Sequence, residues 1–193
     1  ALPISASALQ IVSLALGLMA LLLLTLVRED LLTAWRQSSP PDAPNHFMIN
    51  IQPEQKSLIE SELASNGISD APLYPMIRGR LLQVDGREVR PESYTEERAR
   101  RLVEREFNLS SMFDMPEKNT LVEGRWFDPV KARAEASVEQ GLAKTLGLKL
   151  GDRLRFDVAG QSVDVTITSV RKLDWGSMRV NFFVILSPDV ASA

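Results

Sequence analysis

An uncharged run opens the chain and constrains everything that follows it. Residues 1–27 contain no Asp, Glu, Lys or Arg, and within residues 8–27 the only polar side chains are Gln10, Ser13 and Thr25. Twenty helical residues rise about 30 Å, which is the hydrocarbon thickness of a bilayer. We therefore predict a transmembrane helix over residues 8–27.

Two other interpretations of this run compete with a membrane span. A secretory signal peptide carries a basic segment, an apolar core of about 7–15 residues and a cleavage site of small residues. Here no basic residue precedes the run, the core is longer, and Arg28-Glu29-Asp30 stands where cleavage would occur. A buried helix of a soluble core rarely stays uncharged over this length. The span is favoured over both, and because the chain begins with Ala1 rather than Met, we expect it to be part of a longer protein.

The remainder of the chain has the composition of a water-soluble domain, since all charged residues follow Val27. The net charge is −3, and basic clusters alternate with acidic residues, so we expect no nucleic-acid partner. The chain has no cysteine and one histidine, His46, which excludes disulfides, thiolate sites and His-rich zinc sites. We accordingly predict no catalytic, cofactor-binding or metal-binding residues.

The helical pattern continues beyond the span as a stalk. Leu31, Leu32 and Trp35 lie on one apolar face between charged residues. Three prolines within residues 38–44 exclude a continuing helix and indicate a stiff linker. We therefore assign residues 1–37 to the transmembrane helix and stalk, and residues 38–44 to a Pro-rich linker.

A β-α-β beginning is predicted after the linker. Alternating apolar residues predict a half-buried strand at residues 46–51, and Pro53 and Gly67 mark the two ends of a helix. A second strand is expected over residues 72–84, where it ends at the turn signal Asp85-Gly86. In a unit of this kind the helix packs on a sheet.

The middle of the chain is expected to add a short exposed helix and two strands. Within residues 91–101, Ser93 and Glu96 form a capping-box pattern, and Glu97 and Arg101 have the spacing of a helical ion pair. Strands are expected over residues 103–112 and 120–127, with a turn at residues 115–119 between them.

From Ala134 the pattern indicates a helix followed by a hairpin. Ser137 and Gln140 form a second capping-box pattern, and Gly147 ends the helix. One face of this helix is formed by apolar residues, namely Val138, Leu142 and Leu146. The alternating strands after it, at residues 154–158 and 163–167, predict one wet face and a small accessory module.

The last strand is predicted at residues 181–186, which are nearly continuously apolar. Such a run is typical of a strand that is buried on both faces. We expect this strand to return to the middle of the first sheet.

Taken in order, these segments resemble a known family. The similarity rests on the span, the Pro-rich exit, the β-α-β beginning, residues 136–154 with the hairpin after them, and residues 173–183. They resemble the first periplasmic domain of the MacB-like, FtsX-like (type VII) ABC permeases. Residues 119–126 and 174–178 are most similar to the YbbP-type permeases of that family.

The resemblance implies an α+β fold with two subdomains. A porter-like mixed α/β subdomain would comprise residues 45–133 and 173–193, and a small β-rich, Sabre-like insertion would comprise residues 134–172. The family further implies a place in the bacterial inner (plasma) membrane, with the soluble part in the periplasm.

The resemblance also implies a function and partners. The expected partners are an ABC ATPase subunit and membrane lipids, with one or two permease copies left open. The expected function is mechanotransmission that moves or extracts hydrophobic or lipid-linked substrates. Because the chain has no Walker motif, we expect ATP hydrolysis in the partner and do not expect the chain to be an enzyme.

Residues 172–183 are the best candidates for contact with a partner or substrate. Trp175, Met178, Phe182 and Phe183 gather there, and aromatic and Met side chains are typical of such surfaces. Core packing by the same residues remains an alternative. Two other functions also stay open, a single-span membrane-anchored periplasmic adaptor or binding module and a membrane-anchored hydrolase built on His46.

Overall fold

The computed structural model describes residues 3–38, 43–44, 46–69, 71–128 and 133–190. The chain divides into two compact units. One consists of Ala1–Asn45 with Gly176–Met178, and the other of His46–Trp175 with Arg179–Ala193.

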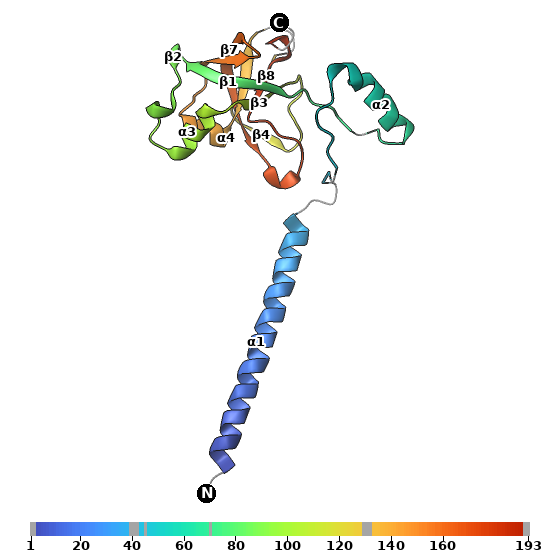
Figure 1. The fold of residues 1–193 in the computed structure, drawn as a ribbon, viewed down its shortest axis with the longest axis vertical. Helices are drawn as coiled ribbons and strands as arrows, with labels where there is room; N and C mark the ends of the chain where they lie inside the picture. Colours follow the sequence, from blue (N-terminus) through green and yellow to red (C-terminus); the bar gives the residue numbers. More distant parts are fainter. Residues whose placement is uncertain (1–2, 39–42, 45, 70, 129–132, 191–193) are drawn as a thin grey trace. The chain divides into compact units, whose positions relative to one another are not determined.

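The first unit contains one long helix, α1 (Pro3–Ser38), drawn in blue in Figure 1. Its 36 residues correspond to about 54 Å of helix. By length and composition, Ser7–Ala34 qualifies as a candidate membrane span. The predicted helix and its continuation through the stalk are confirmed. Most of the Pro-rich linker lies outside the described residues.

The strand predicted at residues 46–51 is wrong, because these residues form no regular structure. Phe47, Met48 and Ile49 are exposed. The backbone of Asn50 has a φ of +61°, which leaves the extended region. Alternation of apolar residues gives a strand only where a neighbouring strand accepts its hydrogen bonds.

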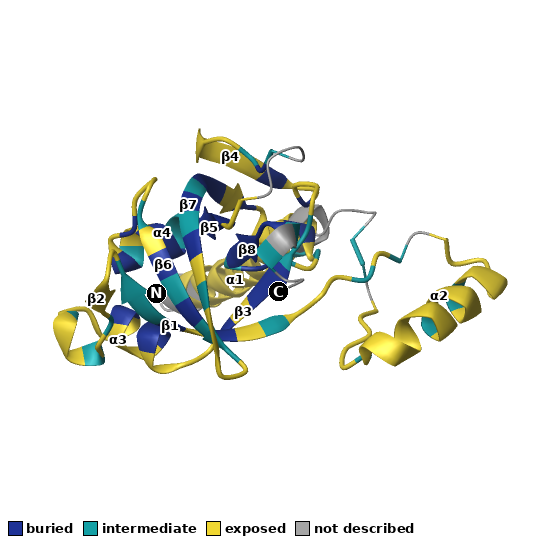
Figure 2. Cartoon of the chain, turned by 90° about the horizontal axis from the view of Figure 1, so that it is seen from above, coloured by how far each residue is buried: buried dark blue, intermediate teal, exposed yellow. Residues whose placement is uncertain are grey.

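The helix after this segment forms as predicted but does not pack on the sheet. It begins with the 3₁₀ turn η1 (Pro53–Gln55) and continues as α2 (Lys56–Ser65), with Gly67 following at a φ of +78°. None of the residues of α2 is buried (Figure 2). The predicted β-α-β unit is therefore not present within the described residues.

The rest of the second unit contains the strands and two further helices. Within the described chain the strands are β1 (Ile77–Val84), β2 (Arg87–Glu88), β3 (Phe107–Ser111), β4 (Asn119–Gly124), β5 (Glu135–Glu139), β6 (Arg153–Val158), β7 (Gln161–Leu173) and β8 (Val184–Leu186). The helices are α3 (Glu97–Glu104) and α4 (Gln140–Leu146), with short 3₁₀ turns η2 (Pro91–Ser93), η3 (Trp175–Ser177) and η4 (Pro188–Val190).

The strand pairings close on themselves. β1 pairs with β3, β3 with β8, β8 with β5, β5 with β7, β7 with β6, and β6 with β1. These six strands form a closed barrel, in which β3–β8 and β5–β7 are parallel and the other pairs are antiparallel. β2 extends the barrel beside β1, and β4 extends it beside β7.

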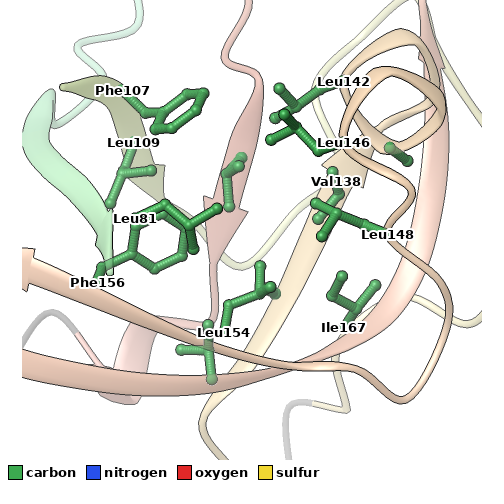
Figure 3. Packing of buried hydrophobic residues seen from close by; sticks show 14 of the residues in the cluster. Leu81, Phe107, Leu109, Val138, Leu142, Leu146, Leu148, Leu154, Phe156 and Ile167 are labelled. Atoms are coloured by element: carbon green, nitrogen blue, oxygen red, sulfur yellow. The ribbon is translucent and has the colours of Figure 1, made fainter. Parts of the chain in front are cut away.

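Apolar side chains fill the barrel, as they do in other small barrels. Leu81 of β1 lies opposite Phe156 of β6, and Leu109 of β3 lies opposite Val184 of β8. Figure 3 shows Leu81, Leu109 and Phe156 in the interior, together with Leu142 and Leu146 of α4 and with Ile167 of β7. The buried residues of α3, Ala99, Leu102 and Val103, belong to the same cluster.

Two predicted helix starts need correction. Residues 135–139 form the buried strand β5 rather than the first turn of a helix, because β7 and β8 pair with them on both sides. The Glu139 carboxylate caps α4 by accepting hydrogen bonds from the backbone N–H groups of Gly141 (2.6 Å) and Leu142 (2.7 Å). The helix end at Gly147, with a φ of +70°, is confirmed.

The second correction concerns α3. Ser93 ends η2 rather than capping α3, and Glu96 occupies the cap position without a side-chain hydrogen bond. The predicted Glu97–Arg101 pair is present. Because Val103 belongs to the helix, the following strand begins only at Phe107.

The predicted hairpins and the last strand are confirmed. Asp85-Gly86 and Ala159-Gly160 both have positive φ at their two residues, which is the geometry of a type I′ turn. All residues of β8 are buried between β3 and β5, although the strand is shorter than predicted. The α+β class with an N-terminal apolar helix is confirmed. The predicted accessory hairpin, β6–β7, is part of the closed barrel rather than a separate sheet.

Candidate functional site

The segment that carries the predicted contact residues connects β7 to β8 and is tied to the turn before β4. Three contacts join them: Asp174 N–H to Lys118 O (3.2 Å), Arg179 Nη1 to Glu117 Oε2 (3.0 Å), and Asn119 Nδ2 to Asn181 Oδ1 (3.0 Å). Two of the three involve backbone or amide groups, which do not titrate. The turn therefore holds both arms of the segment in place.

A buried arginine lies beneath this segment. Arg171 of β7 is fully buried, and its Nη1 donates to Asn119 Oδ1 at 2.7 Å. Its Nη2 donates to the carbonyl oxygen of Phe182. The Nε has no hydrogen-bond partner within the described part of the chain. Arg171 thus joins the strand, the turn before β4 and the return arm of the segment.

The charge on Arg171 is costly to bury. Desolvation lowers the pKa of Arg171 to about 10, and the nearby carboxylate of Glu139, which lies opposite it on β5, partly offsets this effect. A pKa of about 10 still leaves the guanidinium positive at neutral pH. The protein retains a buried cation here, and its planar fork fixes the backbone of the segment at Phe182.

The four predicted contact residues fall into two groups. Trp175 and Met178 are 56% and 55% exposed. Phe182 is buried with Phe127 and Ile185, and Phe183 is half-buried against the barrel core. The rings of Trp175 and Phe183 lie 5.6 Å apart between centroids. The structure therefore presents two of these side chains to solvent and uses the other two for packing.

Comparison with known proteins identifies the family. The model of the MacB-like periplasmic core domain matches residues 7–192. The chain belongs to the MacB-like periplasmic core domain family. It is also 39% identical over 176 residues to YbbP of Escherichia coli (strain K12), described as an uncharacterized ABC transporter permease. The match covers 91% of this chain and 21% of that protein, so the chain spans about a fifth of the relative's length. No solved structure gave a significant match.

These findings confirm the predicted resemblance to the MacB-like permeases and to YbbP. The matched residues, 7–192, include both the candidate membrane span and the barrel. The chain is thus assigned to the ABC transporter permeases of the MacB and YbbP type.

This MacB-like domain has further exposed apolar residues, close in sequence to the segment after β7 and to the turn before β4. Val180 belongs to residues 174–181, and Phe113 and Met115 precede the turn that is tied to them. The indole N–H of Trp126 donates to the carbonyl oxygen of Phe113 at 2.6 Å, which fixes the backbone there. The sequence prediction placed Met115 in a turn and assigned Phe113 to no element. The signal that identifies them is the run Met112-Phe113-Asp114-Met115, which combines Met with an aromatic residue, as residues 175–178 do.

The exposed side chains of this site are apolar or contain sulfur. Among the described residues, no group of three His, Asp or Glu side chains is arranged to hold a metal ion. His46 and Asp174 are both exposed, and each makes an interaction with another part of the chain. Exposed aromatic and Met side chains on a backbone fixed by hydrogen bonds suit apolar partners.

Proposed function

We propose that this chain is the first periplasmic domain, with its membrane helix, of an ATP-driven ABC permease in the bacterial inner membrane. Its role in this proposal is mechanotransmission. Motion driven by an ABC ATPase subunit passes through the membrane helix to the barrel, which moves or extracts hydrophobic or lipid-linked substrates. The family assignment supports the transporter class, and the remaining steps are our own.

The observation that carries this proposal is the continuity of α1. The helix runs without a break from Pro3 to Ser38, and its charged residues begin at Arg28, after the apolar run. Residues 28–38 add about 16 Å of helix beyond that run. A continuous helix transmits rotation and displacement over this distance, whereas a flexible linker of the same length would absorb them.

The first experiment tests the transporter class. The full-length parent protein is purified from membranes in detergent, and copurifying proteins are identified by mass spectrometry. We expect an ABC ATPase subunit whose ATP hydrolysis depends on the permease. A pure preparation without ATPase, from a parent with no nucleotide-binding domain of its own, would contradict the proposal and favour the single-span adaptor.

A second experiment tests the stalk. Seven Gly residues are inserted after Ala34, and the matched control carries seven Ala residues at the same place. Seven residues make about two helical turns, so the Ala insertion preserves helix and register. The readout is the ATP-dependent change in maleimide labelling of a Met178→Cys variant, in a parent without other cysteines.

The expected results distinguish mechanical coupling from simple tethering. The Ala insertion should keep the ATP-dependent change in labelling and the Gly insertion should lose it, while both variants still bind the ATPase. An equal response in the two insertions would remove the stalk from the mechanism. The absence of any ATP-dependent change in the uninserted protein would contradict mechanotransmission itself.

We propose Trp175 and Met178 as contacts to the substrate or partner, with Phe182 and Phe183 supporting them from below. The exposure of the first two and the packing of the last two support this division of roles. Trp175→Ala and Met178→Ala should lower transport while the ATPase still copurifies. Val122→Ala, at an exposed position of β4, is the control and should leave transport unchanged.

The subdomain division is also a proposal. Residues 45–133 with 173–193 would form the porter-like part and residues 134–172 the Sabre-like part. Barrel strands are hydrogen-bonded to one another across this boundary. The two parts would therefore share one sheet and differ in the ligands that they contact. Hydrogen exchange tests whether residues 134–172 form a separate body. Exchange of these residues by an opening of their own would support the division, and opening together with the rest of the barrel would contradict it.

A further inference from the structure

Met178 has a backbone conformation that its residue type disfavours. Its φ is +56°, in the left-handed region where a residue with a Cβ is strained. Among the described residues other than glycine, Asp85 and Ala159 also have a positive φ, but they lie in the type I′ turns of hairpins, which require that geometry. Met178 lies in the connection between β7 and β8, where no hairpin turn requires it.

A strained backbone persists only where the surrounding structure holds it. The chain is attached to the turn before β4 on both sides of residues 175–178, which we call the tip. Asp174 is bonded to that turn before the tip, and Arg179 and Asn181 are bonded to it after the tip. Ser177 of the tip is 2% exposed. The tip is therefore a fixed turn, although Trp175 and Met178 are in solvent.

The buried amide of Asn119 joins these attachments to Arg171. Its Oδ1 accepts a hydrogen bond from Arg171 Nη1 at 2.7 Å, and its Nδ2 donates to Asn181 Oδ1 at 3.0 Å. The same Nδ2 donates to the backbone oxygen of Glu117 at 3.2 Å. Arg171 Nη2 donates to the carbonyl oxygen of Phe182. The two side chains thus fix the chain after the tip at two successive residues.

An apolar side chain would fill the position of Arg171 at a lower cost. Burial lowers the pKa of Arg171, and its Nε has no hydrogen-bond partner in the described part of the chain. Replacing buried charged groups by well-packed apolar residues is often neutral or stabilising. What the arginine adds is the direction of its hydrogen bonds, and these end at Asn119 and at Phe182.

We propose that Arg171 and Asn119 are positioning residues for the contact site at Trp175 and Met178. Their hydrogen bonds, which we call the network, hold Met178 in its strained conformation and keep the tip in one arrangement. The inference rests on the contact role proposed above for Trp175 and Met178, and the two experiments below separate that role from the network.

A tip that is held in this way is prepared for an apolar ligand. Side chains that are ordered only on binding reduce the affinity, because their lost freedom has to be offset. A tip without the network would turn its apolar side chains toward the protein surface, since this removes apolar area from water. The network therefore raises the fraction of molecules that are competent to bind.

The first experiment measures whether residue 178 is coupled to the network. Glycine adopts a positive φ without strain, so Met178→Gly should lower the unfolding equilibrium constant of residues 1–193 about fivefold in urea titrations in detergent. In an Arg171→Met background the same substitution should give no stabilisation, because the tip has already relaxed. Asn181→Ala, which breaks only the outer bond of the network, is the second background in case Arg171→Met does not fold.

Ala159→Gly is the matched control. Ala159 has a φ of +51° in the hairpin between β6 and β7, so its replacement should stabilise the chain by the same factor in every background. If Met178→Gly also stabilises all backgrounds equally, the network does not hold the tip and the proposal is overturned. No gain from Met178→Gly in the unchanged chain would overturn it as well, because Met178 would then carry no strain.

The second experiment measures binding at the tip in the full-length parent. The probe is a long-chain fatty acid that carries a photoreactive diazirine, and mass spectrometry counts its incorporation at residues 175–178. Asn181→Ala should raise the half-saturating concentration of the probe about fivefold and leave the maximal labelling unchanged, because saturating ligand recovers the competent tip. Ala159→Gly should change neither value.

The outcomes distinguish the network from the contact role. Equal half-saturating concentrations in Asn181→Ala and in the unchanged parent would overturn the positioning role alone. A tip that stays unlabelled in the unchanged parent would overturn the contact role of Trp175 and Met178, and with it the purpose of the network, even where the coupling to residue 178 is found.

Discussion

The barrel and the stretch before it, residues 43–78, both contain alternating or periodic apolar residues in their sequences but use them differently. In the barrel, every strand of the ring has neighbours on both sides, and its inward side chains fill one core. In residues 43–78, the apolar side chains face solvent or are only half-buried. The difference shows that alternation and helix signals specify local geometry, while burial depends on which other segments are present to pack against.

This comparison gives the two regions different expected sensitivities to mutation. Substitutions in the barrel remove contacts that the chain makes with itself. Matched substitutions in residues 43–78 of the isolated chain remove almost none. Each prediction below therefore pairs a barrel variant with a control from that stretch, and each is measured on residues 1–193 in detergent.

The largest effect is expected in the barrel interior. Phe156→Ala removes a ring that is 1% exposed and leaves a cavity against Leu81, so it should lower the free energy of unfolding by about 3–5 kcal/mol. Leu58→Ala in α2 should change it by no more than about 0.5 kcal/mol, as exposed substitutions do. Urea unfolding monitored by tryptophan fluorescence measures both values. A loss of similar size at Leu58 would show that α2 packs on the barrel.

An intermediate effect is expected at Gly124 in β4. Its φ is +78°, and a Cβ placed there would lie 2.2 Å from the carbonyl oxygen of Thr168. Gly124→Ala should therefore cost about 2–4 kcal/mol, from backbone strain and from the shift of β7. Gly67 has the same φ of +78° with nothing within 4 Å, so Gly67→Ala should cost only about 1 kcal/mol.

The two glycine variants separate strain from steric contact. Because their φ values are equal, the difference between the two unfolding energies reports the contact with Thr168. If the two substitutions cost the same, β4 does not lie as close to β7 as the structure indicates.

The smallest effect is expected at an exposed ion pair. Arg155 Nε lies 2.6 Å from Asp164 Oδ1, and these residues are directly opposite each other on β6 and β7. The hydrogen bond and charge of Arg155 lower the pKa of Asp164 from 3.8. The stability from this pair is therefore present above pH 3.8 and is lost as the pH falls through the lower pKa of the folded state.

Arg155→Ala should return the pKa of Asp164 toward 3.8, which NMR titration of the carboxyl carbons measures. The change in unfolding energy near neutral pH should be the smallest of the three barrel variants, since both groups are exposed. Lys56→Ala, which removes the Lys56–Glu60 pair of α2, is the control and should leave the pKa of Asp164 unchanged. An unchanged pKa in Arg155→Ala would mean that the pair is not formed in solution.

Local signals in the sequence predicted much of this fold correctly. The uncharged run predicted α1, Gly147 predicted the end of α4, and Asp85-Gly86 predicted one turn, because each of these depends on adjacent residues. The alternating strands at residues 154–158 and 163–167 predicted the second hairpin. Residues 137–139, which belong to β5, were assigned wrongly to the start of a helix. The spacing of the apolar residues in so short a segment fits both the helical period and the strand period. Only the pairing with β7 and β8 decides that the segment is a strand.

The barrel closure and the buried arginine needed information that the sequence does not contain locally. Closure joins β1 to β6 and β3 to β8, which are far apart in the chain. In the sequence, Arg171 comes after the alternating residues 163–167 and looks like an ordinary surface charge. Its burial depends on hydrogen bonds to Asn119 and to the carbonyl oxygen of Phe182, neither of which is its neighbour in the chain. The exposed Trp175 and Met178 and the buried Phe182 were grouped together, because composition alone does not determine which side chains face solvent.

The position of β8 also determines when the barrel can fold during synthesis. The ribosome makes β3 and β5 first, and β8 then has to enter between them. Until residue 186 emerges, each of those strands has an open edge, and open strand edges in a nascent chain are prone to mispairing. Closure of the barrel therefore waits until β8 has emerged, and a ribosome stalled before residue 184 carries a chain in which β3 and β5 keep these open edges.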